Sequence, residues 1–326
     1  MGPTKSTDRI FPITNFLSDL PINHIPQSSL LSSENGPTSG RLVIVGDVHG
    51  MRKSLEALLA KIGFDKCKGD HLILVGDLVN KGPDSSGVID LAIKLDASAV
   101  RGNHENAVLK AAAEINATSD RLPPSGNLSS SSAVPEHPEA DVPGHTVQNF
   151  ETPDKCVSVT TRGTALALST RQLDWLAALP FILRVKLPQG LPSTLGETLV
   201  VVHAGFVPNI PLEDQDPYDI MHMRSLVHTP GDEDVFISAE SPGEETWVTE
   251  WDRWQDRLAS KTTVIFGHDA KRRLQKSRYA IGLDSGCLYG NQLSAVVIAA
   301  SDGEIQHRIV QVECADTPVA PTVSVK

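Results

Sequence analysis

The chain has 326 residues, of which 40% are hydrophobic, 5% aromatic and 21% charged, and its formal net charge is −11. This length can bury a sizeable core, and the composition is typical of a soluble globular protein. The negative charge argues against binding nucleic acid through bulk electrostatics. It does not exclude an anionic substrate, because bound cations reverse the local potential.

Targeting signals are missing from the sequence as given. No apolar run approaches the roughly 18 residues of a transmembrane helix, and residues 1–19 have no basic region followed by an apolar core, so we expect no signal peptide. The four cysteines form no CxxC pair, and a disulfide framework is not expected in a chain of this size. We therefore expect a cytoplasmic location, with the vacuole as the alternative if an N-terminal anchor is missing from this gene model.

The first third of the chain predicts an α/β fold. Residues 1–40 are rich in Ser, Pro, Thr and Asn without periodicity, which predicts a disordered N-terminal arm. A strand over 41–45 and a helix over 53–62 follow, and then a strand over 72–75 and a helix over 86–94. Strands that alternate with helices predict βαβ units and a largely parallel sheet.

The middle of the chain interrupts this pattern. Residues 116–155 are rich in Pro and Ser and predict a disordered insertion within a catalytic domain over 41–312. Beyond the insertion, we expect a helix from Leu173 that ends near Pro180, and then a short strand.

The sequence of the last third predicts a helical cap and a β-hairpin. Residues 205–256, with three tryptophans, are expected to form a helical cap over one side of a cleft. The runs 294–300 and 305–312 meet at Asp302-Gly303, which is a hairpin signal. Residues 313–326 are expected to form a loose tail.

Five short segments carry the functional argument, because each follows a strand-like apolar run and contains glycine. A glycine at the end of a strand lets the backbone turn tightly, so that the next side chain projects from the carboxyl edge of the sheet. The projecting side chains are Asp, His, Asp, Asn, His and His, which together form a ligand set for two divalent cations sharing one carboxylate. The segments are Gly46-Asp-Val-His-Gly50, Gly76-Asp-Leu-Val79, Gly102-Asn-His-Glu105, His203-Ala-Gly205 and Gly267-His-Asp269.

The ordered blocks GDVHG, GDLVNKGPDS, GNHE, HAG and GHD resemble the calcineurin-like metallophosphoesterases of the phosphoprotein phosphatase superfamily, over roughly residues 41–312. The resemblance implies a four-layer αββα sandwich with a dinuclear metal site at the carboxyl ends of the strands. It also implies that Asp77 bridges the two metals. The implied ligands are Asp47, His49 and Asp77 for the first metal, and Asp77, Asn103, His203 and His268 for the second.

Such a pair of cations has a defined chemistry. Two cations about 3.5–4 Å apart clamp the attacking and leaving oxygens of an in-line displacement, and a bridging water becomes a hydroxide nucleophile near neutral pH. The mixed oxygen and nitrogen ligands suit Mn²⁺ or Zn²⁺ first, with Fe or Co²⁺ as alternatives.

Five further site residues follow partly from the resemblance. His104 matches the family's general acid or transition-state donor, and the alternative is a histidine that only fixes its loop. Lys81 stands where relatives carry an arginine that faces the phosphate, and Arg224 matches an arginine of similar relatives. Lys271 and Arg272 begin a basic run after His268 that predicts a stripe for a polyanion. The alternative for these Lys and Arg residues is that they are solvated surface side chains with no role in binding.

Two sequence features indicate the branch of the superfamily. Protein Ser/Thr phosphatases typically carry GDYVDRG in the second block, whereas this chain has Asn80 in place of the Asp that pairs with the GNHE histidine. The segment Gly282-Leu-Asp-Ser-Gly-Cys-Leu-Tyr-Gly290 resembles that of ApaH-type diadenosine tetraphosphatases and ApaH-like phosphatases, among which fungal zinc-dependent endopolyphosphatases look most similar.

The sequence therefore predicts a metal-dependent phosphatase for phosphoanhydrides, with inorganic polyphosphate first and dinucleoside polyphosphates next. One alternative is a protein serine/threonine phosphatase. Another is a non-catalytic scaffold with the same fold, in which residues 1–40 and 116–155 contact protein partners.

Overall fold

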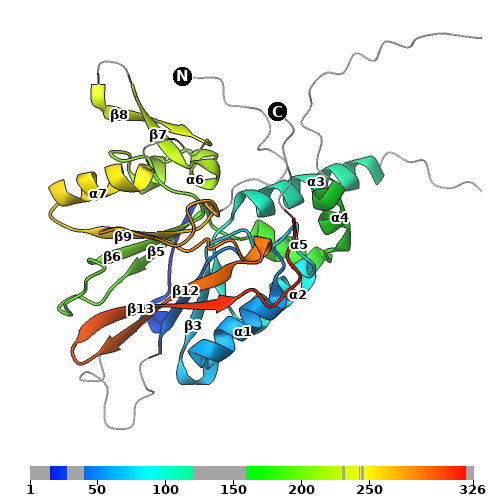
Figure 1. Ribbon diagram of the computed structural model, residues 1–326, viewed down its shortest axis with the longest axis horizontal. Helices are drawn as coiled ribbons and strands as arrows, with labels where there is room; N and C mark the ends of the chain where they lie inside the picture. Colours follow the sequence, from blue (N-terminus) through cyan, green and yellow to red (C-terminus); the bar gives the residue numbers. More distant parts are fainter. Residues whose placement is uncertain are drawn as a thin grey trace, which may run out of the picture.

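Two β-sheets packed face to face form the centre of the fold, and helices cover both outer faces (Figure 1). The computed structural model describes residues 15–27, 40–119, 159–229, 232–241, 243 and 246–320. Three clusters of buried hydrophobic side chains fill the space between the sheets and the two spaces between sheet and helices. The predicted four-layer αββα sandwich is confirmed.

The five-stranded sheet has the order β13-β12-β2-β3-β4. Its β2, β3 and β4 run parallel, as the predicted βαβ units require, and β12 pairs antiparallel with β2 and with β13. The turn between β12 and β13 has positive φ at Asp302 (53°) and Gly303 (79°), which suits a two-residue hairpin turn. The strands are β2 (Leu42–Val45), β3 (His71–Leu74), β4 (Ser98–Ala99), β12 (Gln292–Ser301) and β13 (Glu304–Glu313).

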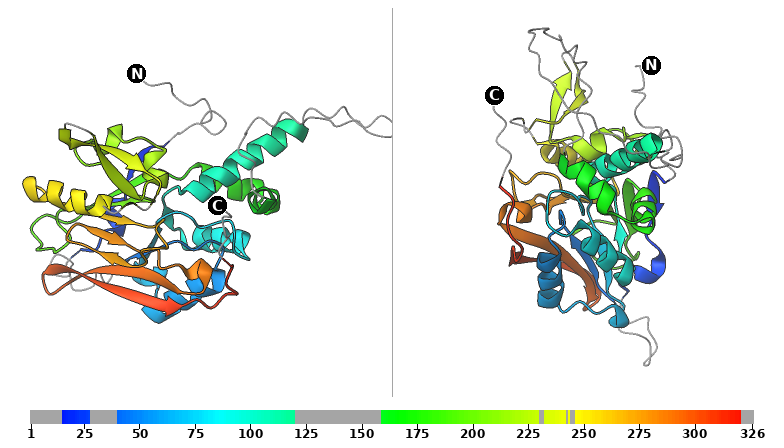
Figure 2. Two further views of the ribbon diagram at one scale, coloured as in Figure 1. Left: turned by 45° about the horizontal axis from the view of Figure 1, so that its top comes forward. Right: turned by 90° about the vertical axis from the view of Figure 1, so that its right-hand side faces the viewer.

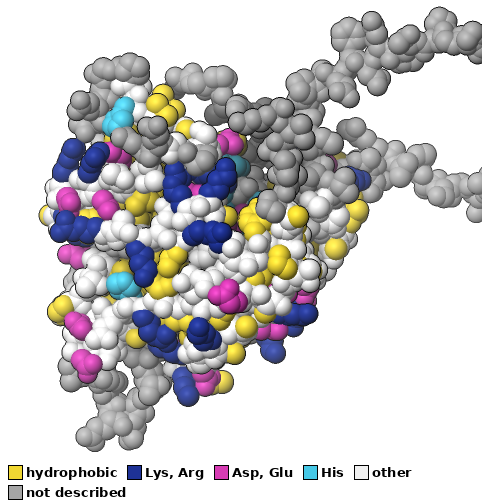
Figure 3. Space-filling model, viewed as in Figure 1, with side chains coloured by type: hydrophobic (Ala, Val, Ile, Leu, Met, Phe, Trp, Pro, Cys, Tyr) yellow, Lys and Arg dark blue, Asp and Glu magenta, His cyan; other side chains and the backbone are white. Residues whose placement is uncertain are grey.

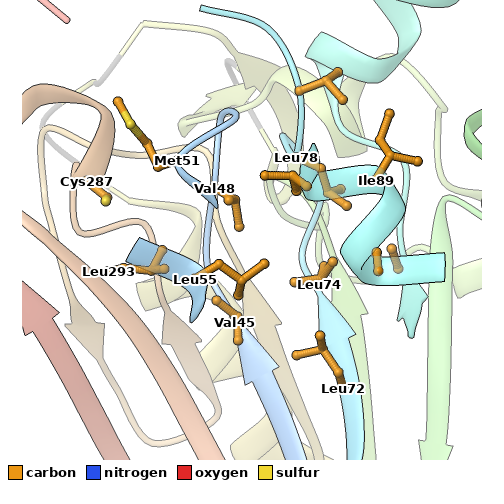
Figure 4. Close-up of a cluster of buried hydrophobic side chains, with 14 of the residues drawn as sticks. Val45, Val48, Met51, Leu55, Leu72, Leu74, Leu78, Ile89, Cys287 and Leu293 are labelled. Atoms are coloured by element: carbon orange, nitrogen blue, oxygen red, sulfur yellow. The ribbon is translucent and has the colours of Figure 1, made fainter. Parts of the chain in front are cut away.

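Helices cover the outer face of this sheet. Figure 4 shows Val45, Leu72 and Leu74 of the strands among Leu55 of α1 and Ile89 of α2. Each such fully buried side chain contributes about 1.5–3 kcal/mol. In Figure 2, α3 and α4 lie side by side at one end of this layer. The helices are α1 (Arg52–Ile62), α2 (Ser85–Leu95), α3 (Asn103–Ser119), α4 (Val159–Ala167) and α5 (Thr170–Ala177).

The six-stranded sheet has the order β1-β5-β6-β9-β11-β10, with β6, β9 and β11 parallel. Its outer face packs against Trp247 and Trp251 of α7. The strands are β1 (Leu17–Asp19), β5 (Ile182–Lys186), β6 (Thr198–Val202), β9 (Thr262–Phe266), β10 (Gln275–Lys276) and β11 (Ala280–Gly282). Short 3₁₀ turns occur at η1 (Ile22–His24), η3 (Lys66–Lys68), η4 (Leu212–Asp214) and η5 (Cys287–Tyr289).

The layer over this sheet is not the purely helical cap that the sequence predicts. It contains α6 (Asp219–His222) and α7 (Trp247–Arg257), but β7 (Ser225–Thr229) and β8 (Asp232–Ala239) form an antiparallel hairpin between them. Residues 225–229 and 232–239 pair as strands because Val227, Phe236 and Ile237 favour a pleated surface. No helix within the described ranges is both long and apolar enough to cross a membrane.

The predicted disordered arm is wrong for residues 15–27. There β1 pairs parallel with β5, and Leu20 and Ile25 are buried. The ion pair between Asp19 and Arg184, at 2.6 Å, adds to this contact. The segment is too short to show a period in the sequence, and its pairing partner lies more than 160 residues away. The rest of the arm lies outside the described residues.

Two other predicted loose segments are partly ordered. α3 continues to Ser119, inside the predicted insertion over 116–155, and most of that insertion lies outside the described residues. The predicted tail contacts the domain as far as Val319: the carboxylate of Asp316 accepts the backbone N–H of Ser54 at 2.8 Å, and the N–H of Val319 donates to the carbonyl of Leu288 at 2.8 Å. The helix expected from Leu173 to Pro180 begins earlier and ends at Ala177.

Candidate metal centre

The predicted ligands come from loops at the carboxyl ends of strands in both sheets. Because the two sheets contribute different ligands, the site is complete only when the sheets pack together. Asp47 and His49 follow β2, Asp77 follows β3, Asn103 begins α3 after β4, His203 follows β6, and His268 follows β9.

The backbone at these loops is strained and tightly approached. A Cβ atom on Gly267 would collide with the carboxylate of Asp47. His49, Asp77 and His268 have φ values of 45°, 51° and 68°, in the left-handed region. Each such non-glycine residue costs about 1–3 kcal/mol, and strain of this kind clusters at functional sites.

Around His203, hydrogen-bond acceptors face one another. Nδ1 of His203 lies 3.0 Å from the carbonyl of Val75 and must donate to it, and Nε2 of His268 lies 3.1 Å from the carbonyl of His222 and must donate in the same way. In the neutral rings, the other two nitrogens, Nε2 of His203 and Nδ1 of His268, each carry a lone pair, and these nitrogens lie 3.2 Å apart. The side-chain amide of Asn103 lies 2.9 Å from the same Nε2 of His203, and with its nitrogen turned inward it donates to the free nitrogens of both rings. With the amide oxygen of Asn103 turned inward instead, a cation between the oxygen and the two ring nitrogens would satisfy all three.

The Asp77 carboxylate lies between this group and His49. Nδ1 of His49 donates to the carbonyl of Val79 at 3.2 Å, and its Nε2 faces Oδ2 of Asp77 at 3.4 Å. Oδ1 of Asp77 lies 3.3 Å from Nε2 of His203. Candidate ligand atoms within 4.8 Å of one another form two groups that share Asp77, one with His49 and His104 and one with His203 and His268. This is the placement that a bridging carboxylate needs.

Buried carboxyl groups make the site strongly acidic. Asp47, Asp77, Glu105 and Asp284 are all buried, and no Lys or Arg within the described ranges forms an ion pair with any of them. Burial raises the pKa of Asp47, as do the nearby carboxyls of Asp284 and Asp77. Burial also raises the pKa of Asp284 to about 6. Uncompensated buried charge is costly, and bound cations would supply the compensation.

The histidines differ in their protonation. Burial lowers the pKa of His49 to about 3, and burial together with His203 lowers the pKa of His268 well below its usual value. Both therefore stay neutral, which is the form that binds metals. Burial also acts to lower the pKa of His203, but the adjacent Asp77 carboxylate outweighs it and raises that pKa. The metal-free site can hold a proton on His203, and a cation would displace it. The donor set therefore fits a pair of divalent cations.

Glu105 is a site residue that the sequence reasoning missed. Its fully buried carboxylate accepts backbone N–H groups of Asp77 (2.8 Å), Leu78 (2.8 Å), Val79 (3.2 Å) and Gly102 (2.9 Å). It thereby holds the loop that presents Asp77. The GNHE block was the sequence signal that could have identified Glu105, and the GLDSG block was the signal for Asp284. The hydrogen bonds of Glu105 to the backbone become visible only in the fold.

His104 is held by Asn80. The side-chain amide of Asn80 donates to Nδ1 of His104 at 3.0 Å, and its orientation is set because its oxygen accepts the N–H of Lys81 at 3.0 Å. The proton of the neutral His104 ring is therefore on Nε2, which faces Oδ2 of Asp77 at 3.9 Å. Burial lowers the pKa of His104 to about 4. Thr161 of α4, beyond the predicted insertion, accepts the Asn80 amide at 2.8 Å.

The four predicted substrate-binding cations differ in their surroundings. Lys81 is exposed, and its charge contributes to the lowered pKa values of His49 and His104. One guanidinium nitrogen of Arg224 donates to the backbone carbonyl of His268 at 3.3 Å. Lys271 is exposed and forms no ion pair with any described residue, whereas Arg272 pairs with Asp269 at 2.5 Å and donates to the carbonyl of Gly243 at 2.9 Å.

Comparison with known proteins agrees with this architecture. The sequence profile of the calcineurin-like phosphoesterases matches residues 40–279, and the chain belongs to that family. It is similar to a zinc-dependent endopolyphosphatase of Saccharomyces cerevisiae, with 28% identity over 94% of this chain and 91% of the relative. A symmetrical bis(5'-nucleosyl)-tetraphosphatase of Acidovorax sp. is 27% identical over 78% of this chain and 91% of the relative. The crystal structure of a protein assigned as a diadenosine tetraphosphatase superposes with a TM-score of 0.60 at 29% identity, covering 92% of this chain and 98% of that chain.

These findings confirm the predicted family and the class of enzyme, a metal-dependent phosphatase. The individual ligands, the identity of the metals and the substrate-binding residues stay predictions.

Proposed function

We propose that this protein hydrolyses phosphoanhydride bonds, with inorganic polyphosphate as the leading substrate and dinucleoside polyphosphates as the next. The observation that carries the proposal is the pair of candidate metal-binding groups that share the Asp77 carboxylate, one with His49 and one with His203 and His268, with the Asn103 amide beside the second. The names of the similar proteins, an endopolyphosphatase and tetraphosphatases, support the choice of anhydride substrates.

The proposed ligands divide between two cations. Asp47, His49 and Asp77 would hold the first, and Asp77, Asn103, His203 and His268 would hold the second. Mn²⁺ and Zn²⁺ are the leading candidates for a mixed oxygen and nitrogen set. When bound, such cations supply positive charge for the phosphate oxygens and lower the pKa of water.

The chain's own residues would orient the phosphate and stabilise the leaving oxygen. His104 stays neutral near pH 7 and carries its proton on Nε2, so it acts as a hydrogen-bond donor to that oxygen. Lys81 and Arg224 supply charges beside the metal ligands that would bind non-bridging phosphate oxygens. Asn80 keeps Nδ1 of His104 as an acceptor and thereby keeps the proton on the nitrogen that faces the site.

The test compares three substrates on one preparation. Protein stripped of metal is reloaded separately with Mn²⁺, Zn²⁺, Co²⁺ or Mg²⁺ and assayed on polyphosphate, diadenosine tetraphosphate and a phosphoserine peptide. We expect chain shortening of polyphosphate with little turnover of the peptide. Dominant turnover of the peptide would instead place the protein among the protein phosphatases, and loss of all three activities would favour the scaffold alternative.

Location and protein contacts also stay predictions. The expected cytoplasmic location, with the vacuole as the alternative, is tested by imaging a tagged protein in cells. Residues 1–40 and 116–155, the proposed contact segments, lie largely outside the described residues.

A further inference from the structure

A groove of about 370 Å³ opens between the two sheets at the side formed by β10 and β13. It is distinct from the candidate metal centre, since none of the predicted ligands lines it. The groove is lined by Thr194, Leu195, Thr263, Lys276, Ser277, Arg278, Ile281, His307, Arg308 and Ile309.

The groove is basic in an acidic protein. Lys276, Arg278, His307 and Arg308 line it, and none of the lining residues is acidic, although the chain as a whole has a net charge of −11. Lys276 and Arg308 form no ion pair with any residue in the described ranges, while Arg278 pairs with Asp256 at 2.9 Å. Figure 3 shows Lys and Arg side chains over this face of the molecule. A pocket with unpaired cations and no carboxylate favours an anion.

A buried hydroxyl group in the groove points to a ligand independently of the charges. The side chain of Thr263, on β9, is 1% exposed and lines the groove, yet its Oγ1 has no hydrogen-bond partner among the described residues. Buried hydroxyl groups almost always have a partner, because leaving one unmet costs about 1–3 kcal/mol. Thr194 and Ser277 add two more hydroxyls to the same lining. Phosphate oxygens accept from hydroxyls and from Lys or Arg alike.

The groove is connected to the metal centre along the chain. Eight residues lead from His268 to Lys276, so the two sites lie at most about 29 Å apart. Between them, Arg273 lines a second hollow of about 420 Å³ together with Ser285, which directly follows the buried Asp284 of the metal centre. Arg273 also forms no ion pair with a described residue. Basic side chains therefore line both hollows, and the second hollow also contains the acidic Glu313.

We propose that the groove of Lys276, Arg308 and Thr263 is a second phosphate-binding site, which holds the distal part of a long phosphate chain while the metal centre holds the part that is cleaved. The identification of the bound polymer as a phosphate chain rests on the proposed function. The binding site itself requires only a polyanion.

The experiment reverses the two unpaired charges. The variant Lys276→Glu/Arg308→Glu changes two exposed side chains, and Lys53→Glu/Lys110→Glu is its control, with the same change of net charge on exposed positions of α1 and α3. Binding of long-chain polyphosphate and of tripolyphosphate is measured with metal-free protein, and KM for both is measured with metal-loaded protein. We expect the variant to weaken long-chain binding and raise the long-chain KM by about tenfold or more, because each charged contact is worth roughly a factor of ten. The control and the KM for tripolyphosphate should change less than about twofold.

A third variant examines the hydroxyl. Thr263→Val removes Oγ1 at nearly constant volume, so the variant should be at least as stable as the parent but should gain less thermal stabilisation from long-chain polyphosphate. Unchanged long-chain binding in both groove variants, or an equal loss in the control, would overturn the inference. Loss of binding in the groove variants alone would support it. If the parent binds polyphosphate through the groove without cleaving it, the proposed function fails and the binding site stands.

Discussion

Nδ1 of His268 lies 3.2 Å from Nε2 of His203, and the other nitrogen of each ring donates to a backbone carbonyl. Two neutral rings in this arrangement present lone pairs to each other. A proton, a cation or the amide nitrogen of Asn103 can satisfy these lone pairs. The Asp77 carboxylate raises the pKa of His203, so the metal-free protein can hold a proton at this position.

Metal binding should consequently release a proton, and metal affinity should fall as the pH falls. Below the raised pKa of His203, each pH unit should weaken binding by about tenfold for each proton displaced. Calorimetry of the metal-free protein in two buffers with different ionisation enthalpies measures the protons released. Equal apparent enthalpies in the two buffers, and an affinity independent of pH between 5 and 8, would contradict the competition between proton and cation.

The grouping of the six predicted side chains was predictable because glycine-terminated strands place them at the carboxyl ends of the strands, and the two sheets that carry them pack together there. Their role as metal ligands stays a prediction. The supporting contacts were not predictable. Glu105 acts through four backbone N–H groups of neighbouring loops, and Asn80 is held partly by Thr161, which is 81 positions away. Neither set of hydrogen bonds produces a periodic pattern in the sequence.

Long-range packing also explains the corrected parts of the fold. Leu17–Asp19 becomes a strand only because β5 offers an edge, and the segment after β13 is fixed by Ser54 and Leu288. Cys287 and Cys314 show the same limit: they are 27 positions apart, yet their Sγ atoms lie 2.9 Å from each other. Separation along the chain says little about such contacts.

Asp77→Asn should abolish metal-dependent turnover and leave most of the fold intact. The amide keeps the Oδ1 acceptor for the N–H of His104 but loses the charge that two cations would share. Hydrolysis assays with a metal titration, beside circular dichroism, measure both effects. Asp214→Asn, at an exposed position, is the control and should retain activity. Full activity in Asp77→Asn would contradict the bridging assignment.

Glu105→Gln should destabilise the protein by about 3 kcal/mol and weaken metal binding. A carbonyl oxygen can replace only part of the carboxylate's four acceptor contacts, and the new NH₂ group would face backbone N–H donors. Urea denaturation of the metal-free protein measures the change in the free energy of unfolding. Glu213→Gln, an exposed residue with a 3.4 Å ion pair to Arg184, should change it by less than about 1 kcal/mol. Equal effects of the two variants would mean that Glu105 does not hold the loop.

Asn80→Asp should shift the pH dependence of catalysis upward. The amide of Asn80 donates to Nδ1 of His104, whereas a carboxylate would accept a proton there and stabilise the charged ring. An adjacent carboxylate raises a histidine pKa by about 1–3 units, so His104 would stay protonated to higher pH than in the parent, where burial lowers its pKa to about 4. Profiles of kcat/KM against pH measure the shift.

The matched control for this change is Thr164→Val. It removes a long 3.4 Å bond to the oxygen of Asn80 and leaves the bond between Asn80 and His104 in place, so its pH profile should follow that of the parent. A charged His104 is a stronger acid for a poor leaving group, and Asn80→Asp should therefore gain on a phosphoserine peptide relative to polyphosphate. Coincident profiles for the parent and Asn80→Asp would show that Asn80 does not set the proton of His104.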